Sequence, residues 1–196
     1  IQEKHPEVVS LGPGEEYELK SSTFEVLPYV FKSERPNDSS EYFRIFGLKN
    51  GKRVYRWIEK KYMTPRYTKE NNIEKWKVFV PESNGSGSFG ETLSTPTVGE
   101  PSDSSTPTFI SLGAFDMEQE ANNLSKYVGT KLVRSLLGIL KITQHNPKSN
   151  WSYIPLQDFT QNSDIDWSKS ISEIDQQLYK KYQLSEEEIA FIEENV

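Results

Sequence analysis

The sequence predicts an α+β fold, in which a mixed or antiparallel sheet contains a β-hairpin and packs against helices. Apolar runs at 42–48 and 53–58 flank an Asn-Gly pair, which is the favoured two-residue hairpin turn because both positions need positive φ. The runs WKVFVP at 76–81 and TFISLGAF at 108–115 predict two buried strands. After residue 116, apolar residues recur at helical spacing, so we expect helices to cover the sheet.

The size and composition of the chain suit a single domain. Its 196 residues, 34% hydrophobic and 12% aromatic, are enough for a sizeable core. We expect one main domain over 1–160 and a small helical C-terminal appendage over 161–196. No apolar run has membrane-spanning length, so no membrane partner is expected, and the lack of cysteine fits a cytoplasmic location. The chain begins at Ile1 without an initiator Met, which indicates a piece of a longer protein.

Charge is segregated along the chain. The net charge is −6, yet the stretch from Arg44 to Lys77 holds eleven Lys/Arg against three Glu, whereas the last twelve residues hold five Glu and no base. A field divided in this way attracts polyanions to one face of an acidic molecule. The alternative is two independent solvated faces that serve only solubility.

The predicted hairpin has a defined register and two interpretations. Its turn sets three cross-strand pairs: Leu48 with Arg53, Phe46 with Tyr55, and Arg44 with Trp57. One face of the hairpin therefore carries aromatic side chains between arginines. This pattern fits ordinary cross-strand packing with cation–π support, and it also fits a surface that follows a phosphate backbone or stacks on bases.

The remaining elements are predicted from turns and caps. Strands are expected at 15–20, at 24–32 and, briefly, at 151–154. The polar segment 82–107 is expected to be a long loop clamped between two strands, and such loops are usually functional or disordered.

A first helix is expected to start at an Asp116 N-cap, with Gln119 completing a capping box, and to end at Gly129. A second helix is expected over 130–143, with its charged face presenting Lys131, Arg134 and Lys141. Capping boxes predict two short C-terminal helices, and their pairs are Ser170 with Glu173 and Ser185 with Glu188.

Most motifs of catalysis are missing from the sequence. It contains no cysteine and two widely separated histidines, His5 and His145, so a Cys/His metal site is excluded in practice. No phosphate-binding glycine loop, dinucleotide fingerprint or Gly-x-Ser-x-Gly nucleophile turn occurs. One weak pattern remains: Asp38 followed by Glu59-x-Lys61 is the order in which a large class of Mg²⁺-dependent nucleases holds its metal and lysine.

The turn after the second helix offers base-reading chemistry. Gln144 and His145 stand beside Asn146, and Gln or Asn supplies the donor and acceptor together that reading adenine requires. Lys141 and Lys148 flank them and suit phosphate contacts. The alternative is that the polar residues simply cap the end of the helix.

A series of ordered blocks covers nearly the whole chain: GKRVYRWI at 51–58, WKVFVP at 76–81, VGEP at 98–101, TFISLGAF at 108–115, ANNLSKY at 121–127, TKLVRSL at 130–136, KITQH at 141–145, IPLQDF at 154–159, LYKKY at 178–182 and EIAFIE at 188–193. These blocks resemble the TaqI-like specificity region, or target-recognition region, of adenine-specific DNA methyltransferases. Such methyltransferases belong to bacterial restriction–modification systems of type II or IIG.

The resemblance implies DNA recognition without catalysis. The family's catalytic tetrapeptide, Asn/Asp-Pro-Pro followed by an aromatic residue, is not present, and NPK at 146–148 does not match it. The implied partners are double-stranded DNA and the catalytic methyltransferase domain of the same parent chain, in the bacterial cytoplasm. No cofactor is implied for this piece, whereas S-adenosylmethionine, and Mg²⁺ where the parent also cleaves, belong to the parent enzyme.

The predicted site is therefore a DNA-binding surface. The residues expected to position phosphates are Lys52, Arg53, Arg56, Arg66, Lys141 and Lys148, and those expected to read base edges are Asn84, Ser86, Ser88, Gln144 and His145. Two alternatives stay open. One is a Mg²⁺-dependent nuclease that uses Asp38, Glu59 and Lys61, and the other is a protein-interaction module whose surface is the acidic C-terminal helices.

Overall fold

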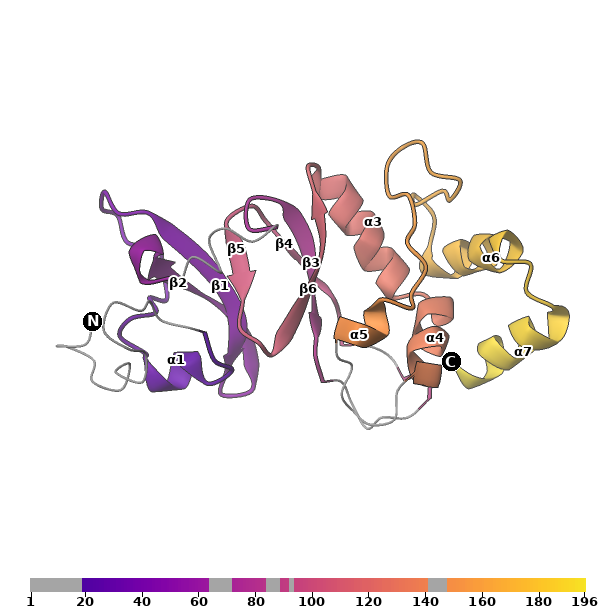
Figure 1. The fold of residues 1–196 in the computed structure, drawn as a ribbon, viewed down its shortest axis with the longest axis horizontal. Coiled ribbons are helices and arrows are strands. Elements are labelled where there is room, and N and C mark those ends of the chain that lie inside the picture. The colour runs from indigo at the N-terminus through magenta and orange to yellow at the C-terminus, as the bar shows by residue number, and fades with distance from the viewer. Residues whose placement is uncertain (1–18, 64–71, 84–88, 92–93, 141–147) are drawn as a thin grey trace.

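The computed structural model describes residues 19–63, 72–83, 89–91, 94–140 and 148–196. Two three-stranded sheets stand next to each other, and most of the helices lie beyond the second sheet (Figure 1). The α+β prediction, with a β-hairpin and packed helices, is confirmed.

The first sheet is built on the predicted hairpin. Strands β1 (Tyr42–Lys49) and β2 (Lys52–Glu59) pair antiparallel, and the short β5 (Asp103–Ser105) joins β1 in parallel, giving the order β2-β1-β5. All three predicted cross-strand pairs are confirmed. Asn50 and Gly51 have positive φ of 51° and 72°, as a turn of this kind requires. A single 3-10 turn, η2 (Lys60–Tyr62), follows β2.

The segment before the hairpin differs from its prediction. The strand expected at 24–32 is instead the short helix α1 (Thr23–Val26) followed by turns, and residues 19–20, the described part of the strand expected at 15–20, are not in a strand. Phe24, Leu27 and Phe31 are each at most 3% exposed, and they lie in one core cluster with Ile45 and Ile58 of the hairpin. Their spacing of three and four residues is that of a helix, and it outweighs the strand preference of the aromatic residues.

The second sheet follows in the chain and has the order β4-β3-β6. Its strands are β3 (Trp76–Pro81), β4 (Thr97–Gly99) and β6 (Phe109–Phe115), all antiparallel. Both strands predicted in this region are confirmed. The segment 82–107 was expected to be one loop, but it contributes β4 to this sheet and β5 to the other.

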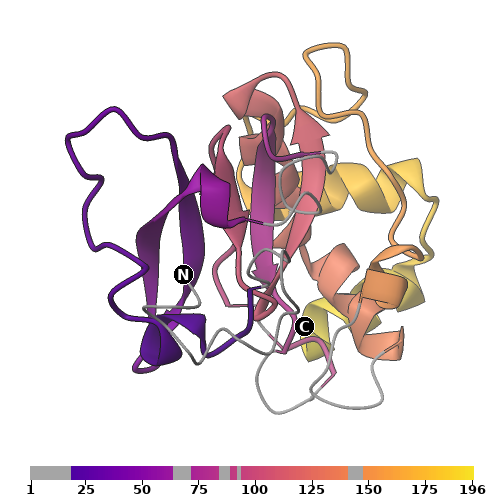
Figure 2. The ribbon, with the colours of Figure 1, turned by 60° about the vertical axis from the view of Figure 1, so that its left-hand side comes forward.

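Five helices are described after the second sheet: α3 (Glu118–Val128), α4 (Lys131–Leu140), α5 (Lys148–Trp151), α6 (Ile171–Lys181) and α7 (Glu186–Asn195). They lie on the side of the second sheet that faces away from the hairpin (Figure 2). Their apolar faces form one core with β3 and β6, in which Val78, Val80, Val133, Ile174 and Leu178 are almost fully buried. Because the core includes residues on both sides of residue 160, the predicted domain boundary falls inside it. None of the described helices is long and apolar enough to cross a membrane.

Several predicted helix ends are confirmed and two local predictions are wrong. Ser170 and Ser185 cap α6 and α7 in the predicted capping boxes with Glu173 and Glu188. Helix α3 begins one residue later than expected, with Met117 at its N-cap, because Asp116 forms an ion pair with Lys75 instead. The strand expected at 151–154 is the end of α5 and a turn, in which Trp151 and Ile154 pack three residues apart against the core.

Candidate nucleic-acid interface

The structure describes only part of the predicted interface. Arg66, Asn84, Ser86, Ser88, Lys141, Gln144 and His145 lie outside the described residues, and of Lys148 only the backbone, at the start of α5, is described. The side chains that can be placed are Lys52, Arg53 and Arg56, all on β2.

Strand β2 presents its cations at a sheet edge. In the order β2-β1-β5 it is one of the two outer strands, so side chains from both of its faces lie near a sheet edge, which the backbone of Lys32 covers at Trp57. Lys52 and Arg53 are exposed at the hairpin turn, and Arg56 is partly buried. Within the described part of the chain, none of these cations forms an ion pair: Arg53 donates to Thr95 O, and Arg56 Nη1 donates to Tyr55 O at 2.8 Å. Their charges remain available to an external anion.

The aromatic and arginine face of the hairpin is used for internal packing. Arg44 Nε and Nη2 each donate to Asp103 across 2.7 Å, so the charge of Arg44 is already neutralised. Phe46 is 3% exposed and packs against Phe79 and Phe109 of the second sheet, with ring centroids 5.6 and 4.5 Å apart. The packing interpretation is therefore correct for this part of the face, and Phe46 is closed to base stacking.

Tyr55 shares this buried environment. The guanidinium of Arg44 lies 4.3 Å from the centre of its ring, and burial raises the pKa of Tyr55 to about 12. Trp57, the next aromatic residue on that face, borders a groove of about 290 Å³. The groove carries Arg35, Arg44 and Lys60 against Glu41, Glu100 and Asp103, so cations and carboxylates balance. Such a groove has little attraction for a polyanion.

The residues of the nuclease alternative lie at one end of the hairpin. Tyr42 pairs with Glu59 across the strands, and its hydroxyl donates to Asp38 Oδ2 at 2.9 Å. Each carboxylate is already engaged, since Asp38 Oδ1 also accepts from Ser40 N and Glu59 binds Lys61 Nζ at 2.5 Å. Hydrogen bonds from Ser40 and Tyr42 hold the pKa of Asp38 below its usual value. Within the described residues, no three His, Cys, Asp or Glu side chains group as a metal site.

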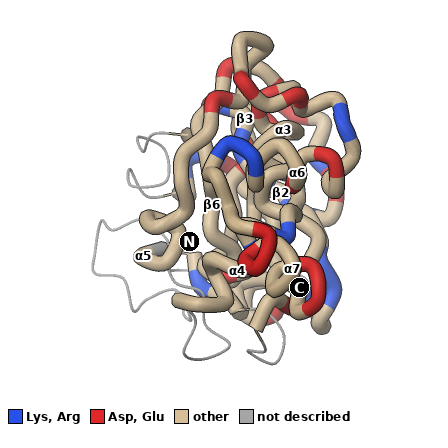
Figure 3. The backbone as a smooth tube through the Cα atoms, turned by 90° about the vertical axis from the view of Figure 1, so that its right-hand side faces the viewer, with Lys and Arg blue, Asp and Glu red and all other residues tan. Residues whose placement is uncertain are grey.

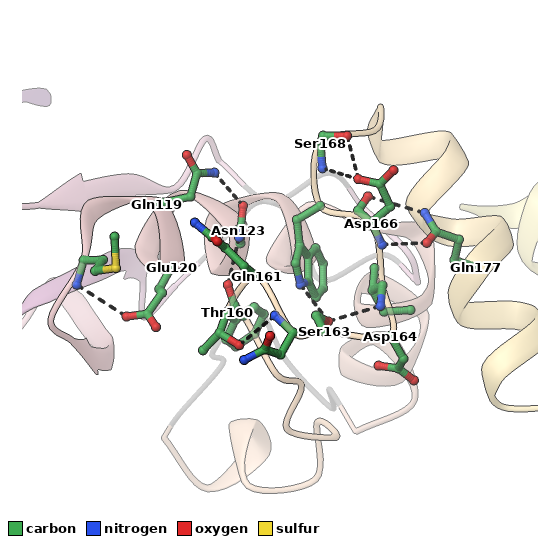
Figure 4. Close-up of a pocket in the computed structure, with 15 residues that line it drawn as sticks. Gln119, Glu120, Asn123, Thr160, Gln161, Ser163, Asp164, Asp166, Ser168 and Gln177 are labelled. Atoms are coloured by element: carbon green, nitrogen blue, oxygen red, sulfur yellow. Dashed lines mark hydrogen bonds between the residues drawn. The ribbon is translucent and has the colours of Figure 1, made fainter.

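A second pocket lies among the helices that follow the second sheet, and it is lined mainly by carboxylates and amides. It has a volume of about 920 Å³ and is lined by α3 and by the segment 159–168 (Figure 4). Amide side chains such as Gln119 and Gln161 share its wall with the carboxylates of Glu120, Asp164 and Asp166. Three carboxylates repel a phosphate, so this pocket does not suit the DNA backbone.

Cations on this side of the molecule are often paired. Lys131 binds Glu193 and Lys181 binds Asp164, at 2.8 and 2.7 Å. The side that carries α7 shows acidic segments at the surface (Figure 3), where Glu186, Glu187 and Glu188 form the first turn of that helix. The charge segregation expected from the sequence therefore appears between the hairpin and the C-terminal helices.

Two contacts of the candidate interface were not predicted. Arg134, expected on the charged face of its helix, instead bonds to the carbonyls of Gly90, Glu91 and Val196. Thr95 receives Arg53 from the hairpin, which joins the end of the long loop to the first sheet. These partners lie more than forty residues apart in the sequence, and no local pattern connects them.

Comparison with known proteins finds no match: no family model fits the chain, and none of the curated proteins or solved structures searched matches it. The resemblance to methyltransferase recognition regions therefore stays a prediction from the sequence.

Proposed function

We propose that this chain is the DNA target-recognition domain of a larger restriction–modification enzyme of the bacterial cytoplasm. Its partners are double-stranded DNA and the catalytic domain of the same parent chain, which would methylate adenine N6 with S-adenosylmethionine. The observation that carries the proposal is the row of cations along β2: Lys52, Arg53 and Arg56 border a sheet edge and form no ion pair within the described residues.

The spacing of these cations suits a phosphate backbone. Lys52 and Arg56 are four residues apart on one strand, which is about 13 Å at the usual rise per residue. Because one strand of B-DNA carries a phosphate about every 3.4 Å along the axis, the two side chains would meet different phosphates. Base reading is assigned to residues that the sequence indicated and that lie outside the described part of the chain: Asn84, Ser86 and Ser88 of the long loop, and Gln144 with His145.

The test is binding of a fluorescent random-sequence duplex across a salt series, with and without Mg²⁺. Affinity that falls steeply with salt while the DNA stays intact supports the proposal. Each of Lys52→Gln, Arg53→Gln and Arg56→Gln is expected to flatten the salt slope by about one unit. Lys180→Gln, which removes an exposed cation from α6, is the matched control and leaves the slope unchanged. No binding at low salt, or equal effects of all four variants, overturns the proposal.

One observation favours a second candidate, the Mg²⁺-dependent nuclease. The hairpin brings Asp38, Tyr42 and Glu59 to the same end, and Lys61 follows two residues later. Under this candidate, the same titration shows cleavage that requires Mg²⁺ and is lost in Glu59→Ala and Asp38→Asn. Intact DNA with Mg²⁺ present removes the nuclease candidate.

A further inference from the structure

Trp57 presents an aromatic ring next to the basic strand. Side chains alternate along β2, so Trp57 lies on the same face as Arg53. Phe46, on the same face of the hairpin, is buried, whereas Trp57 is partly exposed and borders the groove of about 290 Å³. Four residues along a strand span about 13 Å. A nucleic acid held at Arg53 would therefore pass close to the groove.

The inner wall of the groove carries polar groups that are already paired. Both carboxylate oxygens of Asp103 accept from Arg44, each across 2.7 Å. Arg44 Nη2 also contacts Glu100 Oε1 at 3.0 Å, but the side chain of Glu100 is 56% exposed. Its second oxygen can therefore accept a hydrogen bond from a molecule in the groove.

The outer wall offers both donors and acceptors. Arg35 and Glu41 are exposed, and Lys60 is partly buried with its ammonium 4.8 Å from the centre of the Phe43 ring. Within the described part of the chain, Arg35, Lys60 and Glu41 take part in no side-chain hydrogen bond or ion pair. These groups can therefore bond to both kinds of polar atom in a ligand.

The chemistry of the groove suits a nucleobase better than a phosphate. A phosphate presents acceptors alone and is repelled by the carboxylates, whereas a base is uncharged and its edge carries donors and acceptors together. A flat ring also stacks on tryptophan, whichever base it is. The volume is at the lower end of the range for ligand pockets, so it suits one ring system. The exposed Arg35 guanidinium, 5.9 Å from the centre of the Trp57 ring, is free to move aside for it.

We propose that the groove beside Trp57 binds one nucleobase that has left the base stack of the bound duplex. This inference rests on the proposed function and deepens it. Methyl transfer to a base requires that base to be taken out of the duplex, so the DNA of the parent enzyme contains a disrupted base pair. A stacking site next to the phosphate contacts of β2 would stabilise such DNA relative to an intact duplex.

The experiment compares two fluorescent duplexes with a single-nucleotide bulge, of which one has a base at the bulge and the other an abasic sugar. The wild type should bind the first about tenfold more tightly, as expected for one stacked base. Because both duplexes carry the same number of phosphates, this ratio should not change with salt. Trp57→Leu should remove the preference, and Trp57→Phe, which keeps an aromatic face, should retain part of it.

Trp76→Leu is the matched control. Trp76 is also a partly buried tryptophan on a strand, but it lies on β3 and outside the groove. Both leucine variants are expected to lower the melting temperature, so binding is measured below it, and Trp76→Leu should keep the preference. A second readout places 5-iodouracil at the bulge: near-ultraviolet light should cross-link it to Trp57, as peptide mass spectrometry would show.

The outcomes separate the groove from the proposed function, which is judged on a fully paired duplex. If the paired duplex binds with a steep salt dependence but the base at the bulge adds no affinity, the inference is overturned and DNA recognition stands. A preference that survives Trp57→Leu, or that is lost equally in Trp76→Leu, also overturns it. If the paired duplex does not bind but a single strand with 5-iodouracil cross-links to Trp57, the base site stands and the recognition function fails. If no nucleic acid binds at low salt, both fail.

Discussion

Arg44 on β1 holds both carboxylate oxygens of Asp103 on β5, each across 2.7 Å. The pair lies where β1 and β5 run parallel, and Asp103 is 2% exposed. Asp103 Oδ2 also accepts from Glu100 N at 2.9 Å, so the carboxylate organises the turn before β5. A side chain that looked suited to DNA contacts is therefore part of the framework of the first sheet.

Removing Arg44 should be costly for folding. Arg44→Ala leaves the buried Asp103 carboxylate without its cation, and breaking a buried pair in this way costs about 3–5 kcal/mol in unfolding free energy. The side chain of Glu100, the outer partner of Arg44, is 56% exposed. Glu100→Ala should therefore lower the free energy of unfolding by about 1 kcal/mol or less. Urea unfolding of the two variants checks the order, and a smaller cost for Arg44→Ala would contradict it.

Arg44 should make no contribution to DNA binding. Because its charge is already neutralised by Asp103, Arg44→Gln is expected to leave the salt slope of DNA binding unchanged below its melting temperature. Arg56→Gln on the same sheet should flatten the slope by about one unit. The two variants are compared in one anisotropy titration, and a flatter slope for Arg44→Gln would mean that this guanidinium reaches phosphate.

Lys77 should make stability rise with pH in the alkaline range. Its side chain is fully buried on β3 and donates to Ile73 O and Asp103 O, and burial lowers its pKa from 10.5 to about 8. Between about pH 8 and 10.5 the unfolded chain binds a proton that the folded chain has released, so the free energy of unfolding increases with pH. The slope from one group is at most about 1.4 kcal/mol per pH unit.

The measurement is urea unfolding of the wild type and of Lys77→Met at several pH values from neutral to mildly alkaline. The difference between the two proteins isolates Lys77 from other titrating groups. The free energy of unfolding of the wild type minus that of Lys77→Met should increase as the pH rises from neutral into the alkaline range. A constant difference would show that Lys77 keeps an ordinary pKa in the folded protein.

Local chemistry made the hairpin, β3, β6 and the two C-terminal caps predictable. The Asn50-Gly51 turn and the Ser170/Glu173 pair act within four residues, so the sequence contains the whole interaction. Helix α1 was missed because its apolar residues are few and aromatic, and β5 because a strand of three polar residues has no hydrophobic alternation.

The sequence predicted which basic residues the candidate site contains, but not which other residues they contact. The basic character of β2 is evident from the sequence, whereas the pairing of Arg44 joins residues 59 positions apart. Arg134 reaches Gly90 across 44 positions. Whether a cation is available to DNA depends on such distant contacts, and only the fold reveals which of the arginines is already engaged.

Asp175 provides the last prediction, because it caps a helix to which it does not belong. Its two carboxylate oxygens, on α6, accept the backbone N–H of Lys131 and of Leu132 at the start of α4, each at 3.0 Å. Asp175→Ala removes the acceptor of both donors, of which Leu132 N is buried and Lys131 N part-buried, and this should cost about 1–3 kcal/mol in unfolding free energy. Asp175→Asn keeps one acceptor and should cost less.

Glu173→Ala, which breaks the exposed capping box of α6, serves as the control because that cap involves no residue of α4. Because burial raises the pKa of Asp175, its carboxyl binds a proton more readily in the folded chain than in the unfolded one. The penalty of Asp175→Ala should therefore shrink as the pH rises through the acid range and the buried carboxyl must ionise. Urea titrations at acidic and neutral pH measure this, and a penalty that grows with pH would show that the two N–H bonds outweigh desolvation.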